Sequence, residues 1–235
     1  MLLSEMKHPE VAEYLKTKKT IILPCGSTEQ HGLHAPIGTD TISCYEIAKE
    51  VGIRTSTIVA PALPYGFSQG LHCTFPGTIS LSGTTFIAVI HDVLESLVRS
   101  GFHDILIITG HGMNISPLHV AVTDFLHSND AHIIVKGYWE TLEYKALLEE
   151  GEGVHATPSE TAIIQYLQPE LVDMTKAVNE QNYAPYLVGK SEFRSVTNTG
   201  VIANATLATA EKGRNFFEAA VEGMSNLLKR FEMTV

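Results

Sequence analysis

The chain has 235 residues, a net charge of −10 at neutral pH and 44% hydrophobic residues. This length suits one large α/β domain, and we expect a single domain over residues 1–235. The acidic balance argues against nucleic-acid binding, which needs a basic surface. No apolar run reaches the roughly 18–20 residues of a membrane span. Three cysteines at irregular spacing do not make a disulfide framework, so we expect a cytoplasmic protein.

Strand and helix patterns alternate along the chain. In chain order, the sequence predicts a strand at 20–25, a helix at 41–52 ending at Gly52, a strand at 55–63, a helix at 82–101, a strand at 104–110, a helix at 116–128, a strand at 132–139, and helices at 159–167 and 211–232. The poorly periodic stretch 169–208 is predicted to form loops. Continuous apolar strands that alternate with helices predict an α/β fold, with a mainly parallel sheet covered on both faces.

Three polar clusters fall at informative places in this pattern. "GSTEQHGLHAPIGTD" (26–40) follows the first strand, "TGHGMN" (109–114) follows the third, and "GEGVHATPSET" (151–161) precedes a short helix. In open parallel sheets, ligands bind beyond the carboxyl ends of the strands. Histidine, aspartate and glutamate side chains that converge on one edge of a sheet indicate a metal site.

The first two clusters have the chemistry of metal ligands. Glu29 and His31 are two residues apart, so in an extended segment their side chains leave on the same face. Asp40 could bridge two ions if the intervening residues fold back, which the glycines and Pro36 permit. His111 lies between two glycines, where the backbone can come close to a ligand. Nitrogen and oxygen ligands without sulfur suit Zn²⁺, Mn²⁺ or Fe²⁺.

A charge count points to one more ligand. Two divalent ions bring four positive charges, and Glu29, Asp40 and a bridging hydroxide remove three of them. Because uncompensated buried charge is expensive, a further carboxylate is expected, and Glu160 in the third cluster is the candidate.

Simpler interpretations exist for several of these residues. Asp40 could be the N-cap of the helix that follows it. Ser159 could cap its own helix, with Glu160 favoured in the first turn by the helix dipole. Trp139 could be a core residue or a lid over a flat substrate. Cys25 is better explained as a small apolar residue that closes a buried strand than as a catalytic thiol.

Six blocks of the chain resemble, in the same order, those of the creatininase (creatinine amidohydrolase) family. They are "LPCGSTEQHGLHAPIGTD", "PYGFSQGLHCTFPGTISL", "ITGHGMN", "YWE", "HATPSET" and "ATAEKGR", and they span residues 23–214. The resemblance implies a three-layer αβα fold, two divalent ions per subunit (Zn, Mn or Fe), hydrolysis of a C–N bond in a small, often cyclic amide, and a homo-oligomer.

The resemblance also implies roles for individual residues. Its metal ligands fall on Glu29, His31, Asp40 and His111, with Asp40 as the bridge, and its catalytic histidine falls on His155. Glu160 is the expected additional metal ligand. We assign His72, in the second block, and Trp139 to substrate binding.

The chain departs from creatininase itself at three points. Creatininase reads "GHYEN" where this chain has "GHGMN", so that Met113 replaces a glutamate ligand and Gly112 a tyrosine at the substrate. Creatininase closes over creatinine with two tryptophans, whereas this chain has only Trp139. Relatives with the "GHG" form include a formamidopyrimidine nucleotide deformylase of riboflavin and deazaflavin-cofactor synthesis and peptidases of peptide-cofactor maturation. Both remain alternatives here.

The sequence thus predicts a metal-dependent amidohydrolase acting on a small-molecule amide. Two ions would activate a water for attack on the amide carbonyl, and His155, with an ordinary histidine pKa near 6.5, would protonate the leaving nitrogen. A sugar isomerase or aldolase would usually need an eight-stranded barrel, for which the strand signals are too few. A binding module without catalysis is disfavoured by the full ligand set.

Overall fold

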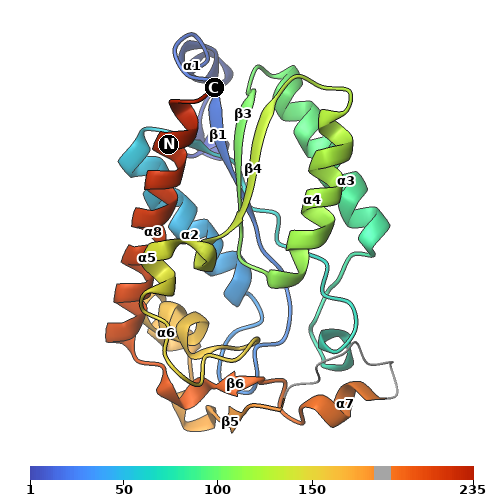
Figure 1. The fold of residues 1–235 in the computed structure, drawn as a ribbon, viewed down its shortest axis with the longest axis vertical. Coiled ribbons are helices and arrows are strands. Elements are labelled where there is room, and N and C mark those ends of the chain that lie inside the picture. The colour runs from blue at the N-terminus through green and yellow to red at the C-terminus, as the bar shows by residue number, and fades with distance from the viewer. Residues whose placement is uncertain (183–191) are drawn as a thin grey trace.

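The computed structural model describes residues 1–182 and 192–235. Its main sheet has four parallel strands in the order β2-β1-β3-β4: β1 (Thr20–Cys25), β2 (Ile58–Val59), β3 (Asp104–Thr109) and β4 (His132–Gly137). Helices cover both faces of this sheet (Figure 1), which gives three layers and confirms the predicted αβα class.

The two faces of the sheet pack against different helices. One face meets α2 (Thr39–Thr55), α6 (Pro158–Leu167) and α8 (Ala210–Glu232), and the other meets α3 (Gly83–Arg99) and α4 (Ile115–Leu126). Alternate residues of each strand enter opposite cores: Ile22 and Leu106 point to the first, Ile21 and Ile105 to the second. Burial on both faces is the reason that the strands are apolar throughout.

The remaining elements are short. They are α1 (His8–Tyr14), α5 (Leu142–Lys145), α7 (Phe193–Val196) and an antiparallel pair formed by β5 (Asn179–Glu180) and β6 (Ala203–Asn204). In the described parts of 169–208, turns and short elements confirm the predicted loop character, while residues 183–191 lie outside the described residues.

The strand register aligns the carboxyl ends of three strands. Cys25 at the end of β1 pairs with Thr109 of β3, and Thr109 pairs with Gly137 of β4. The chain leaves β1 for β2 on one side and then returns to β3 on the other, so the strand order reverses between β1 and β3. Ligands bind at such reversals in open α/β sheets, and the first two polar clusters follow these two strands.

The strand predicted at 55–63 is much shorter in the structure. Only Ile58–Val59 form a ladder with β1, because Pro61 has no N–H to donate. The backbone N–H groups of Ala60 and Leu63 still donate to β1, at 2.8 and 3.0 Å, so the segment continues alongside that strand.

The helix predicted to end at Gly52 continues to Thr55. It ends at Ser56, whose φ of 51° lies in the left-handed region. Gly52 has a packing role instead, since a β-carbon there would lie 2.5 Å from Val59 Cγ2. A glycine that lets a helix approach a strand has the same sequence appearance as a helix stop.

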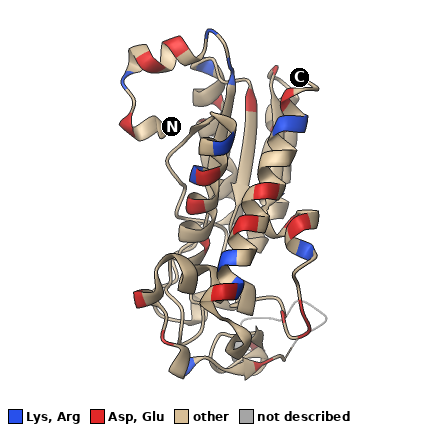
Figure 2. Ribbon diagram, turned by 90° about the vertical axis from the view of Figure 1, so that its left-hand side faces the viewer, with Lys and Arg blue, Asp and Glu red and all other residues tan. Residues whose placement is uncertain are grey.

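On the side drawn in Figure 2, acidic and basic residues are mixed along the outer helices. None of the described helices is both long and apolar enough to cross a membrane.

Gly213 allows α8 to pack closely against α6. A β-carbon at this position would lie 1.8 Å from the Ala162 carbonyl oxygen, whereas one at Gly83, also in the first turn of a helix, would meet only Phe67, at 3.7 Å. We therefore expect Gly213→Ala to lower the free energy of unfolding by about 1–3 kcal/mol through overpacking. Gly83→Ala should be neutral or raise it by up to about 1 kcal/mol. Thermal and denaturant unfolding measure both, and equal stability of the two variants would contradict this explanation.

Candidate metal centre

The loop after β1 folds back on itself and buries its polar residues. The Glu29 N–H donates to the Ile37 carbonyl at 3.0 Å, and His31 forms an antiparallel bridge with Ala35. Gly32, with a φ of +66°, makes the reversal between them. The side chains of Glu29 and His31 are at most 1% exposed, and they converge with Asp40, as the two-residue spacing predicted.

Asp40 does not act as a helix cap. Helix α2 begins at Thr39, its N-cap is Gly38, and Asp40 lies in the first turn. Its two carboxylate oxygens face different histidines: Oδ1 lies 3.2 Å from His31 Nε2, and Oδ2 lies 3.3 Å from His111 Nδ1. This geometry is what a carboxylate that bridges two ions requires, although it is also compatible with ion pairs to protonated histidines.

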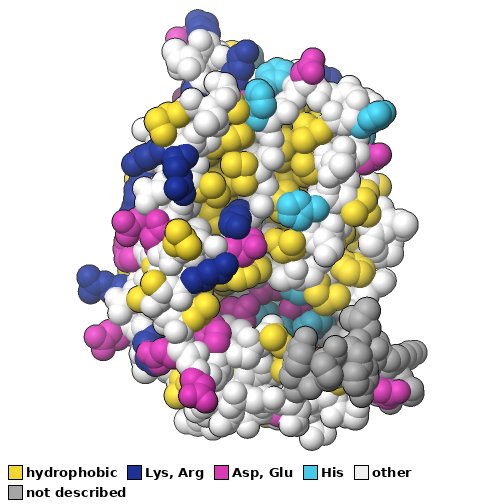
Figure 3. All heavy atoms as spheres, viewed as in Figure 1, with side chains coloured by type: hydrophobic (Ala, Val, Ile, Leu, Met, Phe, Trp, Pro, Cys, Tyr) yellow, Lys and Arg dark blue, Asp and Glu magenta, His cyan; other side chains and the backbone are white. Residues whose placement is uncertain are grey.

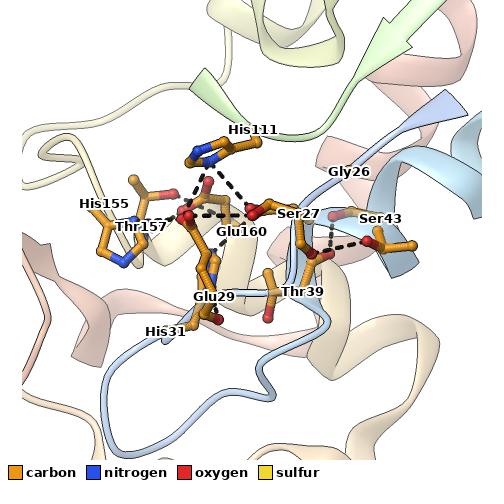
Figure 4. A network of polar contacts seen from close by, with 12 residues as sticks. Gly26, Ser27, Glu29, His31, Thr39, Ser43, His111, His155, Thr157 and Glu160 are labelled. Atoms are coloured by element: carbon orange, nitrogen blue, oxygen red, sulfur yellow. Dashed lines mark hydrogen bonds and ion pairs between the residues drawn. The ribbon is translucent and has the colours of Figure 1, made fainter. Parts of the chain in front are cut away.

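His111 enters the cluster directly after β3. Its Nδ1 lies 3.2 Å from Glu29 Oε1 (Figure 4). The same nitrogen lies 3.3 Å from Asp40 Oδ2. Ligand atoms around one tetrahedral ion, with bonds of about 2.0–2.1 Å, are separated by roughly 3.3–3.4 Å. Gly110 makes this position possible, because a β-carbon there would lie 2.0 Å from the Asp40 carbonyl oxygen.

Backbone carbonyls orient both histidines. The Nε2–H of His111 donates to the Phe67 carbonyl at 3.1 Å, and the Nδ1–H of His31 donates to the Glu29 carbonyl at 3.3 Å. In each ring the other nitrogen points at the carboxylates. Metal-binding histidines in proteins are held in this way, with one ring N–H fixed by an outer partner.

The residues present fit divalent cations. Three buried atoms in the cluster, Glu29 Oε1, Asp40 Oδ2 and His31 Nε2, make no hydrogen bond of good geometry, and their nearest charged neighbours are other cluster atoms at 3.2–3.3 Å. Buried polar atoms are rarely left without one. The donor set consists of imidazole nitrogens and carboxylate oxygens, which suits Zn²⁺, Mn²⁺ or Fe²⁺.

Protons balance the carboxylates in the metal-free chain. Burial opposes ionisation of Glu29, but His111 holds the pKa of that carboxyl well below its usual range. Burial also opposes protonation of the histidines, yet the Asp40 carboxylate raises the pKa of His31 to about 9. Glu29 and Asp40 together raise the pKa of His111 well above its ordinary value. These protons must leave when cations bind.

His155 lies beside the same carboxylate but faces it differently. Its Nδ1 is 3.5 Å from Glu29 Oε1, and its Nε2–H donates to the Gln30 carbonyl at 2.9 Å. Burial, followed by the charges of His72 and His31, lowers the pKa of His155 well below its ordinary value. The expectation of an unshifted pKa near 6.5 is therefore wrong for the metal-free chain, and the ring is neutral at pH 7.

His72, predicted to bind substrate, is also brought to this cluster. Its Nδ1 lies 3.8 Å from Glu29 Oε1 and 3.3 Å from Gln30 Nε2, and its ring centroid is 4.3 Å from that of His155. Glu29, His72 and His155 form a second group of possible ligand atoms, besides the group of Glu29, His31 and Asp40. His155 and His72 could therefore either carry a proton or bind a cation.

Glu160 has a confirmed structural role and stands apart from both ligand groups. It is the third residue of α6 and accepts a hydrogen bond from the Thr157 N–H at 2.8 Å, in a capping box whose N-cap is Thr157 rather than Ser159. Burial, reinforced by Asp40, raises the pKa of Glu160 to about 7, while His31 works in the opposite direction. The carboxyl thus interacts electrostatically with His31 and Asp40, but it belongs to neither of the two buried groups of possible ligand atoms.

Trp139 lies over a cavity next to the cluster. Its indole folds over the end of β4, where a β-carbon on Gly137 would lie 2.6 Å from the ring. The cavity has a volume of about 320 Å³, and Trp139, Gly112 and Glu160 line it. Figure 3 shows acidic and histidine side chains at the floor of a hollow in the lower part of this face. Trp139 therefore packs against the core and lines the cavity, which joins the two interpretations left open by the sequence.

Several supporting residues of the cluster could not be identified from the sequence alone. Gln30 donates from Nε2 to the Gly200 carbonyl at 3.1 Å and contacts both His72 and His155. Ser27 donates to Glu29 Oε2 at 3.4 Å, and Ser68 contacts His111 Nε2 at 3.3 Å. Only the position of Gln30 between Glu29 and His31 could have pointed to it.

The raised pKa of His31 predicts how the metal-free protein responds to pH. A raised folded-state pKa contributes stability below about pH 6.5, which is lost as the pH rises through about 9. Between pH 7 and pH 9 the free energy of unfolding should fall by about 2 kcal/mol from this group. Thermal unfolding of chelator-treated protein tests this. His31→Asn should flatten the slope, whereas His132→Asn, at the exposed ion pair with Asp104, should leave it unchanged.

Comparison with known proteins agrees with this geometry. The family model for creatininase (creatinine amidohydrolase) matches residues 4–228. Creatinine amidohydrolase of Pseudomonas putida is 27% identical, over 89% of this chain and 88% of its own. The 3-dehydro-scyllo-inosose hydrolase of Thermotoga maritima is 27% identical, over 95% and 81%. The mycofactocin precursor peptide peptidase of Mycobacterium tuberculosis is 30% identical, over 88% and 83%.

The fold comparison leads to the same group of proteins. The crystal structure of creatinine amidohydrolase superimposes with a TM-score of 0.87 at 25% identity, over 97% of this chain and 96% of that one. Further creatininase structures at 26% identity are described as an Mn form and as a variant of Zn-Zn type. On the match over nearly its whole length, the chain belongs to the creatininase family.

Proposed function

We propose that this creatininase-family hydrolase is a metal-dependent amidohydrolase that cleaves a C–N bond of a small amide. The observation that supports this most is the position of Asp40, whose two buried oxygens face His31 and His111 separately. A single carboxylate placed between two oriented imidazoles is suited to hold two cations side by side.

The described residues divide into two sets of ligands. Glu29, Asp40 and His111 would hold one ion, and His31 and Asp40 would hold the other. Glu160 remains our candidate for completing the second set, since its carboxyl interacts electrostatically with His31 and Asp40. When bound, two such ions lower the pKa of a water toward neutrality and polarise a carbonyl oxygen. The Mn and Zn-Zn forms of creatininase make these two metals the first to test.

His155 is suited to move the proton of the reaction. In the tautomer that the Gln30 carbonyl selects, the Nδ1 of His155 carries no proton, and the ring is neutral at pH 7. It would accept a proton from the attacking water and pass it to the leaving nitrogen as the C–N bond breaks, giving a carboxylic acid and an amine. An amine leaves readily only when it is protonated, so this transfer is worth roughly 10²–10⁴-fold in rate.

The cavity favours a substrate other than creatinine. A β-carbon on Gly112 would meet nothing within 4 Å, so the cavity is open where creatininase carries a tyrosine. Its volume of about 320 Å³ suits a small molecule better than an extended peptide. The names of the relatives cover creatinine, an inosose and a precursor peptide, and so do not choose a substrate for this chain.

The function is tested with metal-loaded protein and a panel of lactams, cyclic ureas and formamides. Release of amine or formate is followed, with chelated protein and Asp40→Ala as inactive controls. Hydrolysis of one panel member that requires metal supports the proposal. Metal-loaded protein that hydrolyses esters or sugar derivatives but no amide would refute it.

Substitution of Asp40 should remove both ions, because this residue serves both sets of ligands. His31→Ala should lose mainly one ion, since His111 and Glu29 keep the other. Elemental analysis of the purified variants after metal loading should find about zero metal equivalents per chain in Asp40→Ala and about one in His31→Ala. Two retained equivalents in Asp40→Ala would show that the carboxylate does not bridge.

His155→Ala should keep its metal and lose roughly 10²–10⁴ in kcat on an amide with a poor leaving group. Because a good leaving group needs less protonation, the variant should recover on an activated anilide. Metal content, melting temperature and both rates are measured together. A fall in metal content would instead make His155 a ligand, in line with its place in the group with Glu29 and His72. Equal loss on both substrates with full metal would exclude proton donation.

A further inference from the structure

The main sheet has two edges, and the described residues cover only one of them. At the β2 edge, Leu2 forms a parallel bridge with Val59, and the Val59 N–H donates to the Met1 carbonyl at 2.9 Å. At the other edge, β4 pairs with β3 alone among the described strands. Figure 1 shows β4 at the front of the molecule, with no described strand beyond it. An uncovered edge strand is a template for pairing with another strand.

The backbone of β4 alternates in direction along the strand. The His132 N–H donates to the His103 carbonyl at 2.8 Å, so His132 directs its backbone groups at β3. Successive residues of a parallel ladder turn these groups to opposite sides. Ile133 and Val135 therefore direct their N–H and C=O groups away from β3, toward the open edge.

Ile133 and Val135 carry the free backbone groups of this edge. The next outward residue, Gly137, has its N–H taken by the Glu140 carboxylate at 2.8 Å. Within the described part of the chain, the outward groups of Ile133 and Val135 have no hydrogen-bond partner. An antiparallel copy of β4, with a twofold axis at Ile134, would pair each Ile133 with the other copy's Val135, so that both residues donate and accept. Moving the axis by one residue would leave one of them opposite Gly137 or opposite a position outside β4.

The side chains along this edge are apolar. Ile133, Ile134 and Val135 are half-buried, and each packs only partly against one of the two cores. Hydrophobic side chains gather along the middle of the face drawn in Figure 3, where β4 runs in Figure 1. Branched apolar residues that lie opposite one another stabilise a pair of strands. A second copy of β4 would therefore cover this surface as well as satisfy the backbone.

The two ends of β4 carry complementary charges. Asp104 lies beside the first residue of the strand and contacts His132 at 2.9 Å, whereas Lys136 lies near the last residue and contacts Glu140 at 3.7 Å. Antiparallel pairing about Ile134 would place Lys136 opposite the other copy's His132, on the same face of the sheet. The Lys136 ammonium of each copy would then approach the Asp104 carboxylate of the other. This complementarity favours a second copy of the chain as the occupant of the edge.

We propose that β4 is the interface at which two copies of this chain associate, as antiparallel strands related by a twofold axis at Ile134. The two sheets would then form one continuous sheet. A twofold interface joins the same surface of both copies, so the assembly contains an even number of chains. The homo-oligomer implied by the sequence resemblance thereby gains a specific interface, which is independent of the proposed hydrolysis.

The mass of the protein in solution gives the first test. One chain has a mass of 25.7 kDa, and light scattering of the purified protein should give an even multiple of this value. Val135→Pro removes an outward N–H without breaking the ladder between β3 and β4, and it should weaken the association at least 10-fold. Val135→Thr keeps the N–H and the branched shape, and it should associate like the native protein. Melting temperatures confirm that both variants are folded.

A cysteine at the proposed axis tests the register. In a Cys73→Ser background, which lacks the exposed native thiol, Ile134→Cys would place two cysteines with α-carbons about 4.5 Å apart, within the range of a disulfide. Oxidised glutathione should then give a covalent dimer on a non-reducing gel. Lys136→Cys alone should give none, because its two copies would lie roughly 14 Å apart along the strands. The double variant His132→Cys/Lys136→Cys should cross-link again.

The proposal would be overturned by a monomeric native protein, which would make Lys136 a charge that protects the open edge. An assembly with an odd number of chains would exclude a twofold interface for every chain. An unchanged mass of folded Val135→Pro would exclude pairing through β4. Lys136→Cys that cross-links as readily as Ile134→Cys, or Ile134→Cys that does not cross-link, would exclude the register. None of these measurements depends on metal or on hydrolysis, so their failure would leave the proposed function untouched.

Discussion

Two carboxylates buried in contact with the same imidazole are the constraint on which this structure depends. Glu29 and Asp40 are at most 1% exposed, and both have an oxygen within 3.3 Å of His111 Nδ1. Water cannot screen their repulsion there, so positive charge has to be supplied from within. Protonated histidines supply it in the metal-free chain. Divalent cations would supply more positive charge at the same place, and the histidines would then bind them as neutral ligands.

The surrounding backbone fixes this cluster in place. The register that pairs Cys25 with Thr109 brings the loops after β1 and β3 together. Glycines allow the final approach, since β-carbons at Gly26 and Gly110 would lie 2.4 Å and 2.0 Å from the backbone of α2. The Glu29 carbonyl, after β1, and the Phe67 carbonyl, after β2, then select the tautomers of His31 and His111. A site held by backbone atoms needs few specialised side chains beyond its ligands.

The metal-ligand cluster and the cavity are built from different segments of the chain. The ligands come from the ends of β1 and β3, whereas most of the cavity lining comes from residues 138–160, after β4. Glu160 belongs to the wall between them, with one oxygen committed to its own helix cap. A family can therefore keep the cluster while changing cavity residues such as Gly112 or Trp139, which fits the different substrates named for the relatives.

The sequence by itself determined the fold class and the polar residues at the carboxyl ends of β1 and β3, because strand and helix periods and strand-end clusters are local patterns. The sequence also identified Glu29, His31, Asp40 and His111 as candidate ligands of one metal site. It could not separate a helix stop from a close approach at Gly52, nor a cap from a ligand at Asp40. Only tertiary structure decided the shifted pKa of His155 and the partners of Gln30. Burial and charge at these positions depend on contacts with segments that are distant in the chain, so no local sequence pattern indicates them.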